Sequence, residues 1–264
     1  MDDLTNLPNV EVKVDLTDVT KEAYADGGKP FVKELGKTGQ IVLGLINNTL
    51  GLPAQFYNIW ATDKVQAFKN KIENKMEKIS SEKLIEPPMD IIAKSIDGLR
   101  YIPDKEDLKE MFANLMVNSC NSDYSEKTHP RFVEIIKQLS TTDAIIIKSL
   151  SCNSLLASYP IAKILLKKGT GQKELFTHYF DNSLNLEFET VSASISNLIT
   201  LGLITVTYSE YIQNATAYEK LYNTSLYKDF QNFEKSQQEY TLELQRGILN
   251  LSPFGRIFVE VCIK

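Results

Sequence analysis

Apolar residues in the central part of the chain, between Leu84 and Leu139, recur at intervals of three and four. This spacing is typical of helices that bury one face. Each stripe follows a proline, a residue tolerated in the first turn of a helix, where the missing amide hydrogen has no intrahelical partner. The pattern predicts three packed helices, with Phe112, Leu115, Phe132 and Ile136 in the core. The stripes are Met89, Ile92, Ala93 and Ile96; Leu108, Met111, Phe112 and Leu115; and Phe132, Ile135, Ile136 and Leu139.

Beyond Leu139 the pattern predicts both helices and strands. Ser140 and Asp143 have the spacing of a capping box that opens a helix. Residues 159–166 fit either a helix or a strand, and Gly169-Thr170-Gly171 predicts a turn. A helical stripe from Phe188 to Ile199 ends at Gly202, and β-prone runs at 203–208 and 242–251 precede a helix opened by Ser252-Pro253. This order is typical of a winged-helix-like unit.

The chain is therefore predicted to be mainly α, with a multi-helix N-terminal region and a winged-helix-like C-terminal region that contains one small antiparallel sheet. The predicted boundaries are an acidic N-terminal arm at 1–17, a helical region at 18–139, and a winged-helix-like region at 140–264 with a Tyr-rich helical insertion at 209–241. Within the arm, apolar and polar residues alternate from Val10 to Leu16. That period of two fits a flexible arm, an edge strand, or a strand that adds to a partner's sheet.

Residues 38–62 carry no formal charge and are flanked by lysines. Gly51-Leu52-Pro53 interrupts the segment, and no run reaches the ~20 apolar residues that a spanning helix needs. We expect a helical hairpin covered by the protein's own helices or by a second copy, and membrane contact is the alternative. The candidate residues for self-association or membrane contact are Ile41, Leu45, Ile46, Phe56 and Trp60.

The Tyr-rich insertion supplies the candidate protein-binding residues. Aromatic side chains recur there at spacings that place them on one broad helical face. Such a stripe packs on the body of the protein or, if displayed, forms an interface hot spot, because tyrosine offers a large contact area with a polar tip. The candidates are Tyr211, Tyr218, Tyr222 and Phe230.

Charge argues against sequence-specific recognition of nucleic acid. The net charge of −5 lies in residues 1–28, which contain seven acids and two lysines, so the remainder has 27 bases and 27 acids. Residues 186–207, which would include a recognition helix, contain no Lys or Arg. Cationic side chains supply most of the affinity of proteins for nucleic acid. We therefore expect no sequence-specific duplex binding.

Residues that could support catalysis or bind a metal are few. The chain has two histidines, His129 and His178, and three widely spaced cysteines, which fit reduced thiols in a cytoplasm. A nucleophilic pair of Cys120 and His129 is conceivable, but no third group is evident to orient it, so a buried thiol and a histidine at the start of a helix are the favoured interpretation. The sequence thus predicts no catalytic residue, no cofactor and no metal site.

One set of residues is similar to a known protein family. Phe112-Ala113-Asn114-Leu115 with Asn118, His129-Pro130, residues 132–140 and Asp143 together resemble the abortive infection alpha family of bacterial proteins. The similarity is densest between residues 82 and 143 and continues to the C-terminus. It does not cover the first thirty residues or the Tyr-rich insertion. The resemblance implies a mostly helical cytoplasmic protein concerned with phage defence. The family has no established catalytic residues that could be assigned to positions in this chain.

The function predicted from the sequence is a non-enzymatic interaction protein of phage defence, acting by helical self-association or by binding a protein partner. A membrane-active effector that uses residues 38–62 is the alternative, and a DNA-binding regulator is the third hypothesis. We expect a cytoplasmic protein, with a peripheral position at the inner membrane as the variant that the alternative requires.

Overall fold

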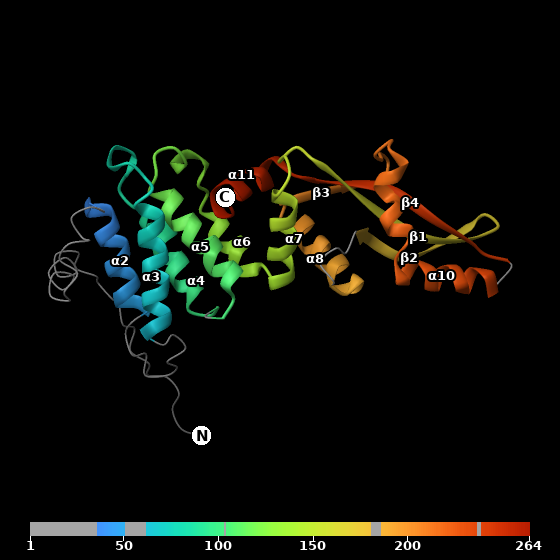
Figure 1. Ribbon diagram of the computed structural model, residues 1–264, viewed down its shortest axis with the longest axis horizontal. Coiled ribbons are helices and arrows are strands. Elements are labelled where there is room, and N and C mark those ends of the chain that lie inside the picture. The colour runs from blue at the N-terminus through green and yellow to red at the C-terminus, as the bar shows by residue number, and fades with distance from the viewer. Residues whose placement is uncertain (1–35, 51–61, 103, 181–185, 237–238) are drawn as a thin grey trace, which may run out of the picture. The chain divides into compact units, whose positions relative to one another are not determined.

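The computed structural model describes residues 36–50, 62–102, 104–180, 186–236 and 239–264. These residues form a mainly helical protein with one antiparallel sheet of four strands (Figure 1). The contacts divide the chain into two units: unit 1 runs to Pro103 and includes Ser119–Ser125, and unit 2 comprises Asp104–Asn118 and Glu126–Lys264. The boundary between residues 139 and 140 stays a prediction.

The helices and strands follow one another along the chain in a helical half and a mixed half. In order they are α2 Gly36–Leu50, α3 Thr62–Met76, η2 Ser81–Lys83, α4 Met89–Leu99, α5 Glu106–Ser119, η3 Ser125–Lys127, α6 Arg131–Gln138, α7 Thr141–Ser151, β1 Ser158–Lys168, β2 Gly171–Phe180, α8 Phe188–Thr200, β3 Ile204–Thr207, η4 Ala215–Tyr218, α9 Glu219–Tyr222, α10 Ser225–Ser236, β4 Thr241–Leu251 and α11 Pro253–Cys262.

In unit 1, helix α2 packs against α3 and α4. The hydroxyl of Thr38 on α2 donates to the carbonyl of Ile85 at 3.1 Å. Leu45 and Ile46 are buried, and Ile41 is half-buried. The second arm of the predicted hairpin, with Phe56 and Trp60, lies outside the described residues. Among the residues described, no helix is long and apolar enough to cross a membrane.

The helical part of unit 2 confirms the predicted central core for α5 and α6, whereas the first predicted helix, α4, belongs to unit 1. The four side chains predicted to be buried are fully enclosed: Phe112, Leu115, Phe132 and Ile136. The ring of Phe132 lies 5.2 Å from that of Phe254 and 5.3 Å from that of Phe258, both on α11. The C-terminal helix therefore packs into the core built by the middle of the chain. The capping box of Ser140 and Asp143 at the start of α7 is also confirmed.

Two asparagines on α5 bind the last turn of α11. The side-chain amide of Asn114 donates to the carbonyl of Cys262 at 3.0 Å, and that of Asn118 donates to the carbonyl of Val261 at 2.8 Å. The last carbonyls of a helix have no intrahelical donor. These amides supply donors across the core, so the contact orients α11 on α5.

Replacing Asn114 with alanine should lower the free energy of unfolding by about 1 to 3 kcal/mol, because the buried carbonyl of Cys262 loses its donor. Urea unfolding followed by circular dichroism measures the change. The partly buried Asn118 provides the matched control, and its alanine variant should lose less. An Asn114 variant as stable as the wild type would show that this hydrogen bond contributes nothing.

The sheet has the strand order β2-β1-β4-β3, and its neighbouring strands are antiparallel. The predicted strands at 203–208 and 242–251 are confirmed as β3 and β4, and residues 159–166 are a strand within β1. The predicted turn at Gly169-Thr170-Gly171 joins β1 to β2, with Gly169 at a φ of 56°. Strand β2 was not predicted. The winged-helix-like label is not confirmed, since a long hairpin of β1 and β2 stands between α7 and α8.

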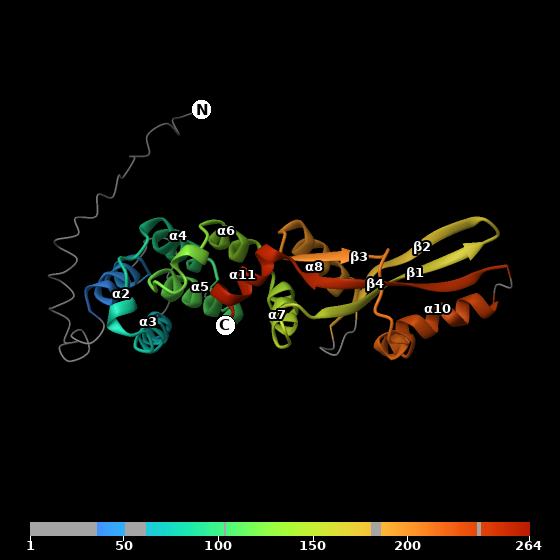
Figure 2. The ribbon, with the colours of Figure 1, turned by 90° about the horizontal axis from the view of Figure 1, so that it is seen from above.

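The insertion between β3 and β4 folds into three short helical segments, η4, α9 and α10, where the sequence pattern predicts one helical face. Its side chains Tyr218, Leu221 and Tyr227 are buried together with Ala162 and Leu244 of the sheet. Figure 2 shows β2, β1 and β4 side by side, with α10 running along β4. The insertion thus covers the apolar face of the hairpin.

Candidate functional site

Strand β2 contains a β-bulge at His178. Ala162 of β1 pairs with Tyr179, whereas Ile164 pairs with Phe176, so β2 has one more residue than β1 across this interval. His178 has a φ of 51° and is the only non-glycine residue with a positive φ among those described. A left-handed backbone at a non-glycine residue costs roughly 1 to 3 kcal/mol and persists where the surroundings enforce it. The neighbours of His178 must therefore hold it in place.

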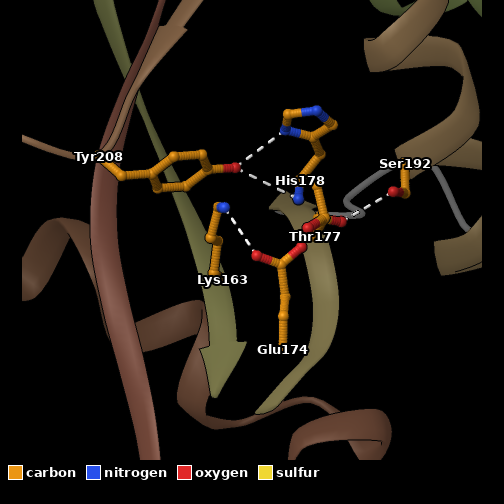
Figure 3. Close-up of polar contacts among 6 residues, drawn as sticks. All are labelled: Lys163, Glu174, Thr177, His178, Ser192 and Tyr208. Carbon is orange, nitrogen blue, oxygen red and sulfur yellow. Dashed lines mark hydrogen bonds and ion pairs between the residues drawn. The ribbon is translucent and has the colours of Figure 1, made fainter. Parts of the chain in front are cut away.

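Tyr208, which follows β3, provides that restraint (Figure 3). Its hydroxyl oxygen lies 2.9 Å from Nδ1 of His178 and accepts the backbone amide hydrogen of the same residue at 3.3 Å. The amide can only donate, so the hydroxyl oxygen of Tyr208 accepts there, and its hydrogen can be donated to Nδ1 when the imidazole proton is on Nε2. A single phenol therefore binds both the side chain and the backbone of the bulge.

The ring of Tyr208 is itself fixed from two sides. The ammonium nitrogen of Lys163 on β1 lies 4.9 Å from the ring centroid and 2.7 Å from the carboxylate of Glu174 on β2. On β4, a Cβ atom at Gly247 would lie 2.6 Å from Cδ1 of Tyr208, closer than van der Waals contact permits. Glycine at this position lets the ring lie against the strand. Residues of β1, β2 and β4 thus surround the side chain of Tyr208.

The electrostatic environment keeps both rings neutral at pH 7. Burial lowers the pKa of His178, the nearby Lys163 lowers it further, and Glu174 opposes them. Burial raises the pKa of Tyr208 to about 12, and Glu174 adds to the rise, whereas the hydrogen bond from the His178 backbone opposes it. A neutral phenol and a neutral imidazole form a hydrogen-bonded pair, so the geometry is suited to positioning the chain. Within the described ranges, no group of three or more His, Cys, Asp or Glu residues could hold a metal ion.

The loop from Tyr208 to Ile212 is held at its far end as well. The backbone amide of Ile212 donates to the hydroxyl of Tyr218 at 3.0 Å, and that hydroxyl donates to the carbonyl of Gly247 at 2.8 Å. Between these two points, Tyr211 exposes 59% of its surface. An aromatic side chain is therefore displayed on a loop that is anchored at both ends.

The candidate interaction residues predicted from sequence lie in different surroundings. Tyr211 is exposed, Tyr218 is fully buried, and Tyr222 and Phe230 are half-buried against the core of unit 2. Tyr218 anchors the loop from within the core, because its hydroxyl accepts the backbone amide hydrogen of Ile212. Whether these residues contact a partner stays a prediction.

Neither residue of the conceivable nucleophilic pair is set up for that chemistry. Burial raises the pKa of the Cys120 thiol to about 11, so it is protonated at neutral pH. His129 lies at the start of α6, where its Nδ1 accepts the backbone amide of Arg131 at 3.0 Å. This is the helix-start role that the sequence predicts for His129.

The site around His178 and Tyr208 was missed from the sequence. It depends on a bulge in a strand that was not predicted and on residues from β1, β2, β4 and the loop after β3. No spacing along the chain connects Lys163, His178, Tyr208 and Gly247. The usable signal was only that His178 is one of two histidines.

Comparisons with known proteins place the chain in a family. The abortive infection alpha family matches residues 61–262, a range that includes the insertion as well as the central helices. No curated protein and no solved structure matches the chain. The match covers most of the sequence. The chain therefore belongs to the abortive infection alpha family.

Proposed function

We propose that this protein is a non-enzymatic interaction protein of phage defence and that it binds a protein partner through the loop Tyr208–Ile212, with Tyr211 at its centre. Membership of the abortive infection alpha family supports the biological setting. The observation that supports this binding surface is the exposed ring of Tyr211, which lies between the hydrogen-bonded anchors Tyr208 and Tyr218.

The loop Tyr208–Ile212 is anchored at both ends, which lowers the entropic cost of forming a complex. A loop that becomes ordered only on binding loses conformational entropy at that step, which weakens the complex. Here the hydroxyls of Tyr208 and Tyr218 hold the loop before any partner arrives. Tyrosine has few rotatable bonds and combines a large apolar ring with a polar tip, so it is enriched in binding hot spots. Tyr211 therefore has the properties of a preorganised anchor.

Burial of the candidate self-association residues favours a partner other than a second copy bound through α2. Leu45 is 8% exposed and Ile46 is fully buried. Both residues are enclosed within unit 1, where α2 packs against α3 and α4. Their use in an interface would require α2 to leave these helices, whereas Tyr211 is displayed already.

Replacing Tyr211 with alanine should abolish protection against phage without changing stability. Removal of a central aromatic anchor typically costs at least ~2 kcal/mol of binding, which lowers affinity about thirtyfold, whereas an exposed substitution changes folding by about 0.5 kcal/mol or less. Efficiency of plating on cells that express each variant measures protection, and urea unfolding measures stability.

Tyr101 provides the matched control, since it is an exposed tyrosine of unit 1 with 72% of its surface accessible. Its alanine variant should protect like the wild type. A Tyr211→Phe variant separates the ring from its hydroxyl. If Tyr211→Ala protects as well as Tyr101→Ala, in a strain where the wild type protects, the loop is not the partner surface.

A further inference from the structure

We infer that the contact between His178 and Tyr208 is pH-sensitive: protonation of the His178 imidazole opens it and releases the loop that carries Tyr211. The contact is observed within unit 2. Its consequence for partner binding rests on the proposed function. The strained bulge at His178 thereby regulates the adjacent loop.

First, in the closed contact, His178 has a left-handed backbone conformation. Its φ of 51° is one that residues other than glycine rarely adopt. The restraints on this conformation come from the Tyr208 hydroxyl, which binds Nδ1 at 2.9 Å and the backbone amide at 3.3 Å. If that hydroxyl moves away, the backbone of His178 can relax toward an ordinary conformation, and relaxation favours the open state.

The second step is the proton count at the hydroxyl. With neutral His178 protonated on Nε2, the hydroxyl oxygen accepts one backbone N–H and its own hydrogen goes to Nδ1. With protonated His178, Nδ1 carries a hydrogen and can no longer accept. The half-buried hydroxyl of Tyr208 then faces two donors, and its own hydrogen loses its acceptor. A polar hydrogen without an acceptor in a partly buried site is unfavourable.

The third step is the charge around the imidazole (Figure 3). Lys163 from β1 repels a second cation, Glu174 from β2 attracts it and is paired with Lys163 at 2.7 Å, and Tyr208 is the titratable group from the loop after β3. Helix α8 meets this part of β2 through the uncharged hydroxyl of Ser192, which donates to the carbonyl of Thr177 at 2.7 Å. Strand β4 contributes Gly247. Burial and Lys163 together disfavour the imidazolium.

The sign of the pH dependence follows from these contributions. Burial, and then Lys163, lowers the pKa of His178 in the closed contact below the ordinary value of 6.5, so the open state binds a proton more readily. The contact is therefore fully stable above pH 6.5 and weakens as the pH falls from that value through the lower pKa of the closed state. Opening removes one of the two anchors of the loop and leaves the bond between Ile212 and Tyr218.

The test is hydrogen exchange on the full chain at about pH 7.5 and about pH 5.5, with rates corrected for the intrinsic effect of pH. The peptide that covers Tyr208–Ile212 should exchange about tenfold faster at the lower pH after this correction. His178→Asn should abolish the increase, because asparagine tolerates the left-handed region and its side-chain oxygen can accept from Tyr208 without titrating. The matched control His129→Asn, at the other histidine, should behave like the wild type.

A second measurement keeps the inference testable if His178→Asn does not fold. The His129→Asn variant retains one histidine, so the imidazole resonances seen by NMR belong to His178. We expect them to titrate below 6.5, together with a change at the Tyr208 ring. A midpoint at or above 6.5, or a loop whose exchange is independent of pH, would overturn the inference. Exchange is measured without a partner, so failure here leaves the Tyr211→Ala result intact, and the reverse also holds.

Discussion

Replacing Phe112 with alanine is expected to lower the free energy of unfolding by about 3 to 5 kcal/mol. The side chain lies on α5 and is fully buried, as is its neighbour Leu115. Truncation removes the transfer free energy of the ring and leaves a cavity that close-packed neighbours fill only in part. The loss is large compared with the 5 to 15 kcal/mol that typically stabilises a folded protein.

Urea unfolding of the full chain, followed by circular dichroism, measures this loss. Phe233 on α10 provides the matched control, because the same substitution there removes a ring that is 48% exposed. Its alanine variant should lose about 1 kcal/mol or less. Equal losses for the two variants would mean that α5 is not at the centre of the core of unit 2.

Replacing Gly255 with alanine is the second substitution with a large expected effect. A Cβ atom at this position would lie 1.8 Å from the carbonyl oxygen of Leu203, which is backbone and cannot rotate away. The same junction is held by Ser252, whose amide donates to Leu203 and whose hydroxyl donates to the carbonyl of Gly202. In the alanine variant, the start of α11 must therefore move away from the turn between α8 and β3.

Two effects of opposite sign meet at Gly255, and their magnitudes decide the outcome. Alanine favours a helix over glycine by about 1 kcal/mol, whereas overpacking costs about 1 to 3 kcal/mol, and the upper end applies here because backbone atoms must shift. We expect a net destabilisation of about 2 kcal/mol, measured by thermal and urea unfolding. Gly171→Ala is the control, because its Cβ would lie at an ordinary 3.5 Å from the carbonyl of Lys168. A Gly255 variant as stable as this control would contradict the packing.

The helical core was predictable because its signal is local and repeated. The stripes on α5 and α6 mark buried helical faces, and the predicted core side chains Phe112 and Phe132 are fully enclosed. In the first stripe Ile92 and Ile96 are buried, but Met89 and Ala93 are exposed. The caps were equally readable, since Ser140 with Asp143 and Ser252 with Pro253 depend on spacings of a few residues.

The hairpin was only partly predictable because β2 lacks the alternation of a half-buried strand. Its first four residues are exposed, and its two buried residues come at the end of the strand, after the bulge. Residues 159–166 contain Pro160 and a run of apolar residues, which left helix and strand open until pairing with β4 fixed a strand. Strand pairing joins residues far apart in sequence, so periodicity alone cannot reveal it.

The roles of two residues in the family resemblance emerged only with the structure. Asn114 and Asn118 bind the carbonyls of Cys262 and Val261, more than 140 residues further along the chain. The contact between His178 and Tyr208 is of the same kind, because it requires a bulge and a register that local patterns do not specify. Tyr211 and Tyr218 were both predicted from sequence as candidate interaction residues in the insertion. That Tyr218 is buried and anchors the loop emerged only with the structure, and the other anchor, Tyr208, was not among the candidates.

Photo-crosslinking in infected cells tests the central claim, that the loop Tyr208–Ile212 contacts a protein partner. A benzophenone side chain at Glu210 leaves Tyr211 intact, and the same group at Arg100, also exposed, serves as the control in unit 1. The proposed surface predicts one discrete protein adduct from position 210 that disappears when Tyr211 is replaced with alanine. No adduct from position 210, in cells that the crosslinker variant still protects, would contradict it.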